Sequence, residues 1–144
     1  MKIHLATDHP GFEHKEFLKA FLLEQGYEVV DHGAKELDEN DDYPDFVTPC
    51  AQAIANSPED KAVIFGGSGE GEAMCANRVK GVRAVVYYGG STEILTFSRD
   101  HNDANILSIG ARFVNMEDVP NIVKMWLETP FSGNERHVRR LGKF

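Results

Sequence analysis

A glutamate at the end of a glycine-rich loop is the strongest candidate for proton chemistry in this chain. The loop runs from Gly66 to Glu72 (GGSGEGE), and Glu72 stands where a helix is expected to begin. Burial in a cleft poor in water would raise the pKa of this carboxyl, whereas the helix N-terminus would lower it, and the sequence leaves the balance open. Glu72 is therefore either a general base or only a residue that complements the helix dipole. Glu70 is expected to be solvated.

The same loop is suited to a negatively charged ligand. It has four glycines within six residues, which allow sharp turns and a close approach of the backbone to a bound group. Amides near a helix N-terminus favour an anion, so those of Gly67, Gly69 and Gly71 are candidate binding groups. The pattern is neither GxGxxG nor a P-loop, because no lysine follows. The alternative is that the loop serves only as a tight strand-to-helix turn.

Histidines beside acidic residues form a second group of candidates. Asp8 and His9 end the first predicted strand, and such a pair can orient and tune an acid–base group. The alternative is an aspartate that caps a loop beside a surface histidine. His101 and Asn102 lie between the fourth and fifth predicted strands. No HExxH motif or other ligand spacing is present, so we expect no metal.

Basic residues gather at the end of the chain, in Arg136, His137, Arg139 and Arg140. Arg136 and Arg140 are four residues apart, so on a helix they share one face, and two guanidinium groups on one face suit a phosphate. The alternative is a solvated basic C-terminus. The formal net charge of the whole chain is -8, which argues against non-specific binding to nucleic acid or to an anionic membrane.

The elements that must position these residues alternate between strand and helix along the whole chain. Strands are expected over Lys2–Thr7, Tyr27–Asp31, Lys61–Phe65, Arg83–Tyr88 and Ile106–Ile109. Helices are expected over Phe12–Gln25, from Pro44, over about Glu72–Val79, over Thr92–Asp100, after Asn115 and over Glu135–Leu141. This alternation predicts a single α/β domain over residues 1–144, with a doubly wound, five-stranded parallel sheet in the order 2-1-3-4-5, helices on both faces and a C-terminal helical tail.

The predicted topology places the site. Ligands bind beyond the carboxyl ends of such strands, where the strand order reverses, which here lies between the first and third strands. The loops at these two ends are Asp8–Gly11 and Gly66–Glu72, the two most chemically loaded loops of the chain. The acidic loop from His32 to Tyr43 is expected to be solvated. No apolar run approaches the ~20 residues that span a bilayer, and no signal-peptide pattern is seen, so we expect a cytoplasmic protein.

The chain resembles the ribose-5-phosphate isomerase type B family, which is related to the galactose-6-phosphate isomerase subunits. The resemblance covers nearly the whole chain, and the joint order and spacing of its motifs make it specific. The motifs are ATDHPGF at Ala6–Phe12, DYPD at Asp42–Asp45, GGSGEGE at Gly66–Glu72, ANRVKGVRA at Ala76–Ala84, SRDHNDAN at Ser98–Asn105, GAR at Gly110–Arg112 and the arginine-bearing tail.

The resemblance implies roles at the sugar end of a substrate. Ser68 matches the hydroxyl residue that helps to hold the carbonyl end of the sugar. Asp8 and His101 match residues implicated in opening the furanose ring. Tyr43 matches a tyrosine that lines the sugar site, and Asn102 matches a residue near the enediolate.

The resemblance also implies a phosphate-binding set made of His9, Arg112, Arg136 and Arg140. In the family, the segment around His101 and the tail arginines reach the site from a neighbouring subunit. The expected assembly is a homodimer or a dimer of dimers.

One departure from the family pattern concerns the base. Many members place a catalytic cysteine directly after the third strand, but this chain has Gly66 there. Cys50 and Cys75 are not at that position and are expected to be core side chains. Another branch has glycine there and a glutamate base at the end of the loop motif, which here is Glu72.

The resemblance implies a reversible interconversion of ribose 5-phosphate and ribulose 5-phosphate through a cis-enediolate, without a cofactor. One alternative is the same chemistry on a tetrose phosphate, allose 6-phosphate or galactose 6-phosphate. Another is a non-catalytic phosphate- or nucleotide-binding module, which would leave Glu72, Asp8 and His101 without a task. A third is one subunit of a hetero-oligomeric isomerase.

Overall fold

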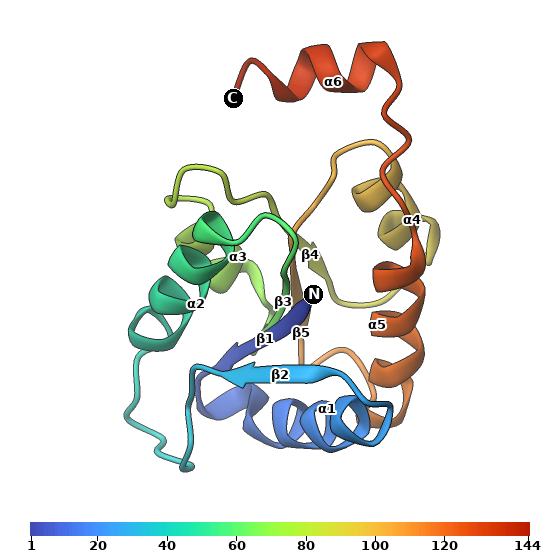
Figure 1. Cartoon of the computed structure of the whole chain (residues 1–144). Helices are drawn as coiled ribbons and strands as arrows, with labels where there is room; N and C mark the ends of the chain where they lie inside the picture. Colours follow the sequence, from blue (N-terminus) through green and yellow to red (C-terminus); the bar gives the residue numbers. More distant parts are fainter.

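A computed structural model describes all residues from Met1 to Phe144 and shows a five-stranded sheet between two layers of helices (Figure 1). The strands are β1 (Lys2–Thr7), β2 (Glu28–Asp31), β3 (Lys61–Gly66), β4 (Ala84–Tyr87) and β5 (Ile106–Gly110). The helices are α1 (Phe12–Glu24), α2 (Pro44–Asn56), α3 (Glu70–Ala76), α4 (Glu93–Asp100), α5 (Val119–Glu128) and α6 (Glu135–Leu141), with single 3-10 turns η1 (His9–Gly11) and η2 (Met116–Asp118).

All neighbouring strands run parallel, which confirms the predicted fold class, but the predicted strand order is wrong at one end. The order is β2-β1-β3-β5-β4, so that Val63 of β3 pairs with Leu107 of β5, and Val85 of β4 lies at the edge. The physical reason lies in burial. All five residues of β5 are buried, as a central strand requires, whereas three of the four residues of β4 are only partly buried.

Two apolar cores lie on the two faces of the sheet. Helices α2 and α3 cover one face, and α1, α4 and α5 cover the other (Figure 1). Successive strand residues alternate between the cores, so that Val63 and Phe65 belong to one, and Ala62 and Ile64 to the other. The larger core is completed by Leu18, Leu22, Leu95, Val119, Val123 and Trp126, and the smaller by Val47, Cys50, Ala51, Ile54 and Ala76.

Helix ends follow the expected local chemistry in most places. Pro44 begins α2, and Gly26 follows α1 in the left-handed region with φ +83°. Helix α3 begins at Glu70, two residues before the predicted start, because Gly69 adopts φ +82° and turns the chain directly into the helix. Glu72 is therefore the third residue of α3, and its side chain faces inwards.

Helix α6 projects away from the sheet at the end of the chain (Figure 1), as the sequence predicts for the tail. The connection to it is fixed at the end of α4. The backbone amide and the hydroxyl of Ser132 both donate to the Asp100 carbonyl, at 3.0 and 2.7 Å. His137 of α6 is buried and stacks on the His101 ring, with 4.4 Å between ring centroids. None of the helices is long and apolar enough to cross a membrane.

Candidate active site

Two loops meet at the carboxyl ends of β1 and β3, where the strand order reverses. The hydroxyl of Thr7 donates to the Asp8 carbonyl at 2.8 Å and to the Phe65 carbonyl at 3.1 Å, so it bridges the ends of the two strands. Gly11 closes η1 directly against β3, and a Cβ there would overlap Phe65 and Thr7. The sequence-based placement of the site rests on these two loops, and the structure puts them side by side.

Glu72 is buried at this edge, with only 4% of the residue exposed. Its carboxylate lies over Gly66, in the space that a side chain at position 66 would fill. Burial raises the pKa of Glu72, and the negative charge of Asp8 raises it further, while a hydrogen bond from its own backbone lowers it. Of the two opposing effects that the sequence leaves open, burial is therefore the larger, and the carboxyl is poised to accept and release a proton.

Asp8 is the second buried carboxyl of the edge. Its residue is 6% exposed, and its Oδ1 has no hydrogen-bond partner within the chain. Burial raises the pKa of Asp8, whereas the nearby charges of His9 and Arg112 lower it. A buried acceptor without a partner is costly unless something else supplies a donor, so this oxygen is suited to a ligand hydroxyl.

His9 is held by a carboxylate of the acidic loop. The sequence predicts that Asp41 is solvated with the rest of this loop, but the prediction is wrong for Asp41, because its side chain is only 7% exposed. Its Oδ1 accepts from the His9 backbone amide at 3.0 Å and from His9 Nδ1 at 2.7 Å. Nothing in the local sequence distinguishes Asp41 from Asp38 or Asp42, because the contact joins two residues that lie 32 positions apart.

The glycine loop carries the remaining residues of this edge. A Cβ at Gly71 would lie 2.8 Å from the Tyr43 hydroxyl, and one at Gly67 would lie 3.1 Å from the Arg112 guanidinium. The tyrosine and the arginine thus cover the loop from two sides. Ser68 is partly buried, and its hydroxyl accepts from the Glu70 amide at 3.3 Å. Gly69 packs against β5, where the Ser108 hydroxyl donates to the Gly69 carbonyl at 2.6 Å.

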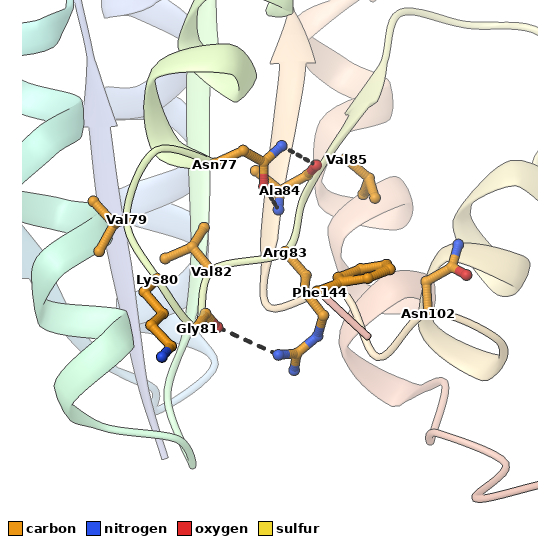
Figure 2. A pocket seen from close by; sticks show the side chains of 10 residues that line it. All are labelled: Asn77, Val79, Lys80, Gly81, Val82, Arg83, Ala84, Val85, Asn102 and Phe144. Atoms are coloured by element: carbon orange, nitrogen blue, oxygen red, sulfur yellow. Dashed lines mark hydrogen bonds between the residues drawn. The ribbon is translucent and has the colours of Figure 1, made fainter. Parts of the chain in front are cut away.

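Four of the predicted site residues lie at the amino ends of the strands, opposite to the carboxyl ends where Glu72 lies. Helix α4 returns from the carboxyl end of β4 to the amino end of β5, so His101 and Asn102 lie beside the strand starts. Asn102 and Phe144 line a cavity of about 530 Å³ together with Arg83 (Figure 2). Arg136 and Arg140 belong to α6, which His137 ties to His101. Within one chain, His101, Asn102, Arg136 and Arg140 therefore do not join Glu72.

The chain matches the protein-family model described as Ribose/Galactose Isomerase over residues 3–144. A ribose-5-phosphate isomerase B from Mycolicibacterium paratuberculosis is 36% identical to it, and the match spans 98% of this chain and 87% of that protein. The chain belongs to the ribose/galactose isomerase family.

Solved structures of this family share the whole fold. The ribose-5-phosphate isomerase B of Clostridium thermocellum is 40% identical, with a TM-score of 0.92 and coverage of 99% of this chain and 94% of that one. The enzyme of Mycoplasma genitalium, solved with bound ribulose 5-phosphate, is 36% identical, with a TM-score of 0.92 and coverage of 99% and 92%.

The two cysteines of this family member lie on the helices α2 and α3, and neither takes the position of Gly66 at the end of β3. Cys50 is fully buried in the smaller core, and burial raises the pKa of its thiol to about 12, which leaves no thiolate near neutral pH. Cys75 is partly buried on α3, and its sulfur lies 3.4 Å from the Thr48 hydroxyl. The prediction of a core position is therefore confirmed for Cys50, and it is only partly right for Cys75.

One group of side chains has the composition of a cation site. Asp8, His9 and Asp41 each offer a ligand atom, and these atoms lie within 4.8 Å of one another. His9 Nδ1 and Asp41 Oδ1 already share a hydrogen bond, and the positive Arg112 acts on Asp8. Both features disfavour a cation, and the expectation of a metal-free, cofactor-free protein stays a prediction.

Proposed function

We propose that the chain is an aldose–ketose isomerase that interconverts D-ribose 5-phosphate and D-ribulose 5-phosphate through a cis-enediolate, as one domain over residues 1–144. The observation that carries the proposal is the buried Glu72 carboxylate, which lies over Gly66 beside Asp8 at the carboxyl edge of the sheet. A related structure of the same fold holds ribulose 5-phosphate. We also propose that the protein works in the cytoplasm, where its two free cysteines would stay reduced.

Glu72 is the proposed general base. The reaction moves a proton between C2 and C1 of the open-chain sugar, and one carboxylate on the correct face can remove it and return it. A raised pKa suits this task, because the protonated form must persist long enough to deliver the proton to the other carbon. General base catalysis of this kind accounts for about 10²–10⁴-fold in rate.

The glycine loop is the proposed binding site for the developing enediolate. Amides of Gly67, Gly69 and Gly71 and the Ser68 hydroxyl are donors at the end of β3, close to Glu72 in the same loop. A well-placed donor of this kind contributes about 3 kcal/mol to the stability of the transition state. Tyr43, whose hydroxyl lies over Gly71, would line the sugar.

Ring opening and phosphate binding are proposed to require a second copy of the chain. Asp8, His9 and Arg112 are supplied at the Glu72 edge, whereas His101, Asn102, Arg136 and Arg140 lie at the other edge. In a symmetric dimer, the carboxyl end of the sheet in each copy can lie against the amino end of the sheet in the other copy, which creates two equivalent sites. Helix α6 projects from the domain, as it must if its arginines are to reach the site of a second copy (Figure 1). The arginines would then hold the phosphate and convert remote binding energy into position at C1 and C2.

A hexose phosphate is the second candidate substrate, since the matched family is described by both ribose and galactose. Comparison of kcat/KM for tetrose, pentose and hexose phosphates would separate the two, and an optimum at six carbons would displace the pentose. A hetero-oligomeric isomerase would show activity only with a partner subunit, and a simple phosphate-binding module would show none.

The deciding experiment is an isomerase assay with ribose 5-phosphate on the purified chain and its Glu72→Gln variant. We expect turnover by the wild type and a loss of kcat of about 10²-fold or more in the variant. Glu70→Gln is the matched control, because Glu70 is exposed on the first turn of the same helix. Turnover close to that of the wild type in Glu72→Gln would rule out Glu72 as the base.

A further inference from the structure

The loop between β2 and α2 contains one carboxylate with an unusual environment. Glu36, Asp38, Glu39 and Asp42 are exposed, whereas the Asp41 side chain is 7% exposed. One oxygen of Asp41 receives two hydrogen bonds from the same residue, His9, which lies 32 positions earlier in the sequence. The other oxygen is buried and has no partner within the chain.

This contact fixes the state of the His9 ring. A carboxylate can only accept hydrogen bonds, so the ring nitrogen at 2.7 Å, Nδ1, must carry a proton. The same Asp41 oxygen also accepts from the His9 backbone amide at 3.0 Å. The two hydrogen bonds together fix the position of the carboxylate relative to His9, and therefore they also fix the orientation of the ring. The side chain of His9 is 33% exposed, and Nε2 makes no hydrogen bond within the chain, so it is the ring nitrogen left for a ligand.

We propose that Asp41 is a positioning residue for phosphate binding, which holds His9 as an imidazolium whose Nε2–H is free to donate to a phosphate dianion. The inference rests on the proposed function only in the identity of the ligand. A neutral ring with its proton on Nδ1 would present a lone pair at Nε2 and repel a phosphate oxygen, whereas the imidazolium presents a charged donor. Asp41 therefore acts through His9 and need not contact the substrate.

The charges around His9 favour this state. Asp41 and Glu39 face it from the loop, Asp8 faces it from the end of β1, and Arg112 lies beyond Asp8 over Gly67. The hydrogen bond to Asp41 is the largest effect on the pKa of His9 and raises it, against a smaller lowering by burial. Asp8 contributes less than Asp41 to the stability of a charged His9, because burial raises the pKa of Asp8 and so disfavours its ionised form. Burial of a carboxylate is costly unless a positive group pairs with it, and the His9 ring is the group within hydrogen-bond distance of the 7% exposed Asp41 side chain.

A purely structural role predicts different behaviour. If Asp41 only anchored the loop, an asparagine would serve almost as well, since its carbonyl oxygen can accept the same two hydrogen bonds. It would differ from aspartate only in charge. Asp41→Asn therefore separates the charge of the carboxylate from its shape, and Glu36→Gln is the matched control, with the same change of charge at an exposed position in the same loop.

The first test compares steady-state kinetics of Asp41→Asn and Glu36→Gln with those of the wild type between pH 6 and pH 9. At pH 7.5 we expect Asp41→Asn to raise KM for ribose 5-phosphate about tenfold, in the range of a hydrogen bond to a charged group, with kcat changed less than about threefold. The ratio of the two KM values should shrink towards pH 6, where His9 is protonated in both proteins. A KM ratio that is close to one, or that stays constant with pH, would overturn the inference.

The second test uses inorganic phosphate as a probe, with binding measured by calorimetry. Asp41→Asn should weaken phosphate binding about tenfold in the wild-type background and have no further effect in a His9→Ala background. Equal losses in both backgrounds would show that Asp41 does not act through His9. A wild type that binds phosphate in this Asp41-dependent way but does not isomerise ribose 5-phosphate would refute the proposed function and leave the positioning role intact.

Discussion

The burial of the Glu72 side chain should determine how the turnover of the protein depends on pH. Burial and the charge of Asp8 raise the pKa of Glu72 above the ordinary value of 4.5. A general base acts in its ionised form, so kcat at saturating substrate should fall as the pH falls through this raised pKa. A kcat that stays flat down to pH 4.5, with the fold intact by circular dichroism, would contradict this assignment.

Gly66 allows the base to lie where it does. Because a Cβ at position 66 would overlap the Glu72 carboxylate, Gly66→Ala should push the carboxylate away from its position. Small displacements of a catalytic group lower rates steeply, and we expect kcat to drop by about 10²-fold while the thermal midpoint changes little. Kinetics and thermal unfolding of the same preparation check this, and unchanged kcat would mean that the carboxylate has room elsewhere.

At the scale of elements, a buried lysine ties α1 to the end of β2. Lys15 is fully buried, and its ammonium lies 2.8 and 2.9 Å from the two oxygens of Asp31, which also accepts from Lys19 at 2.6 Å. The lysines hold the pKa of Asp31 below its ordinary value, against the effect of burial. The lowered pKa means that this stability is present above about pH 4 and is lost as the pH falls through the pKa of Asp31.

Asp31→Asn should therefore lower the free energy of unfolding by about 3 kcal/mol, because it removes the better buried counter-charge of the Lys15 ammonium and leaves only Glu16, at 2.7 Å and 39% exposed, beside it. Urea unfolding at pH 7 measures this. Glu28→Gln is the control, since the ion pair of Glu28 with Lys2 is exposed and should contribute much less to stability. A loss in Asp31→Asn as small as that of the control would mean that the buried ammonium finds another partner or water.

The sequence predicts most elements because their signals are local. The apolar stripe of α1, Pro44 at the start of α2 and the buried run of β3 each act within a few residues. The exchange of β4 and β5 and the inward position of Asp41 depend instead on contacts between distant segments. The order of the strands depends on how much of each strand the helices cover, which no short stretch of sequence records. Asp41 contacts a residue 32 positions away, so its burial leaves no local pattern either.

At the scale of the whole molecule, the candidate site is divided between two edges of one sheet. The base, the glycine loop, Asp8, His9, Tyr43 and Arg112 lie at the carboxyl edge, and His101 with the tail arginines lies at the other. The stacked rings of Phe97, His101 and His137 join α4 to α6, so the proposed ring-opening histidine is in contact with the helix that carries the arginines. Under the proposed arrangement, one copy would supply the Glu72 half of the site and a second copy would supply the His101 and arginine half.

Complementation between two inactive variants tests this claim most directly. Glu72→Gln lacks the base, and a variant with both Arg136→Ala and Arg140→Ala lacks the arginines, so each alone should be nearly inactive on ribose 5-phosphate. Co-expression gives mixed dimers in which one of the two sites has both an intact Glu72 and intact arginines. Since random pairing makes half of the dimers mixed, we expect about a quarter of the wild-type activity to return. Activity no higher than that of the two variants assayed separately, with mixed dimers present, would contradict a site shared between subunits.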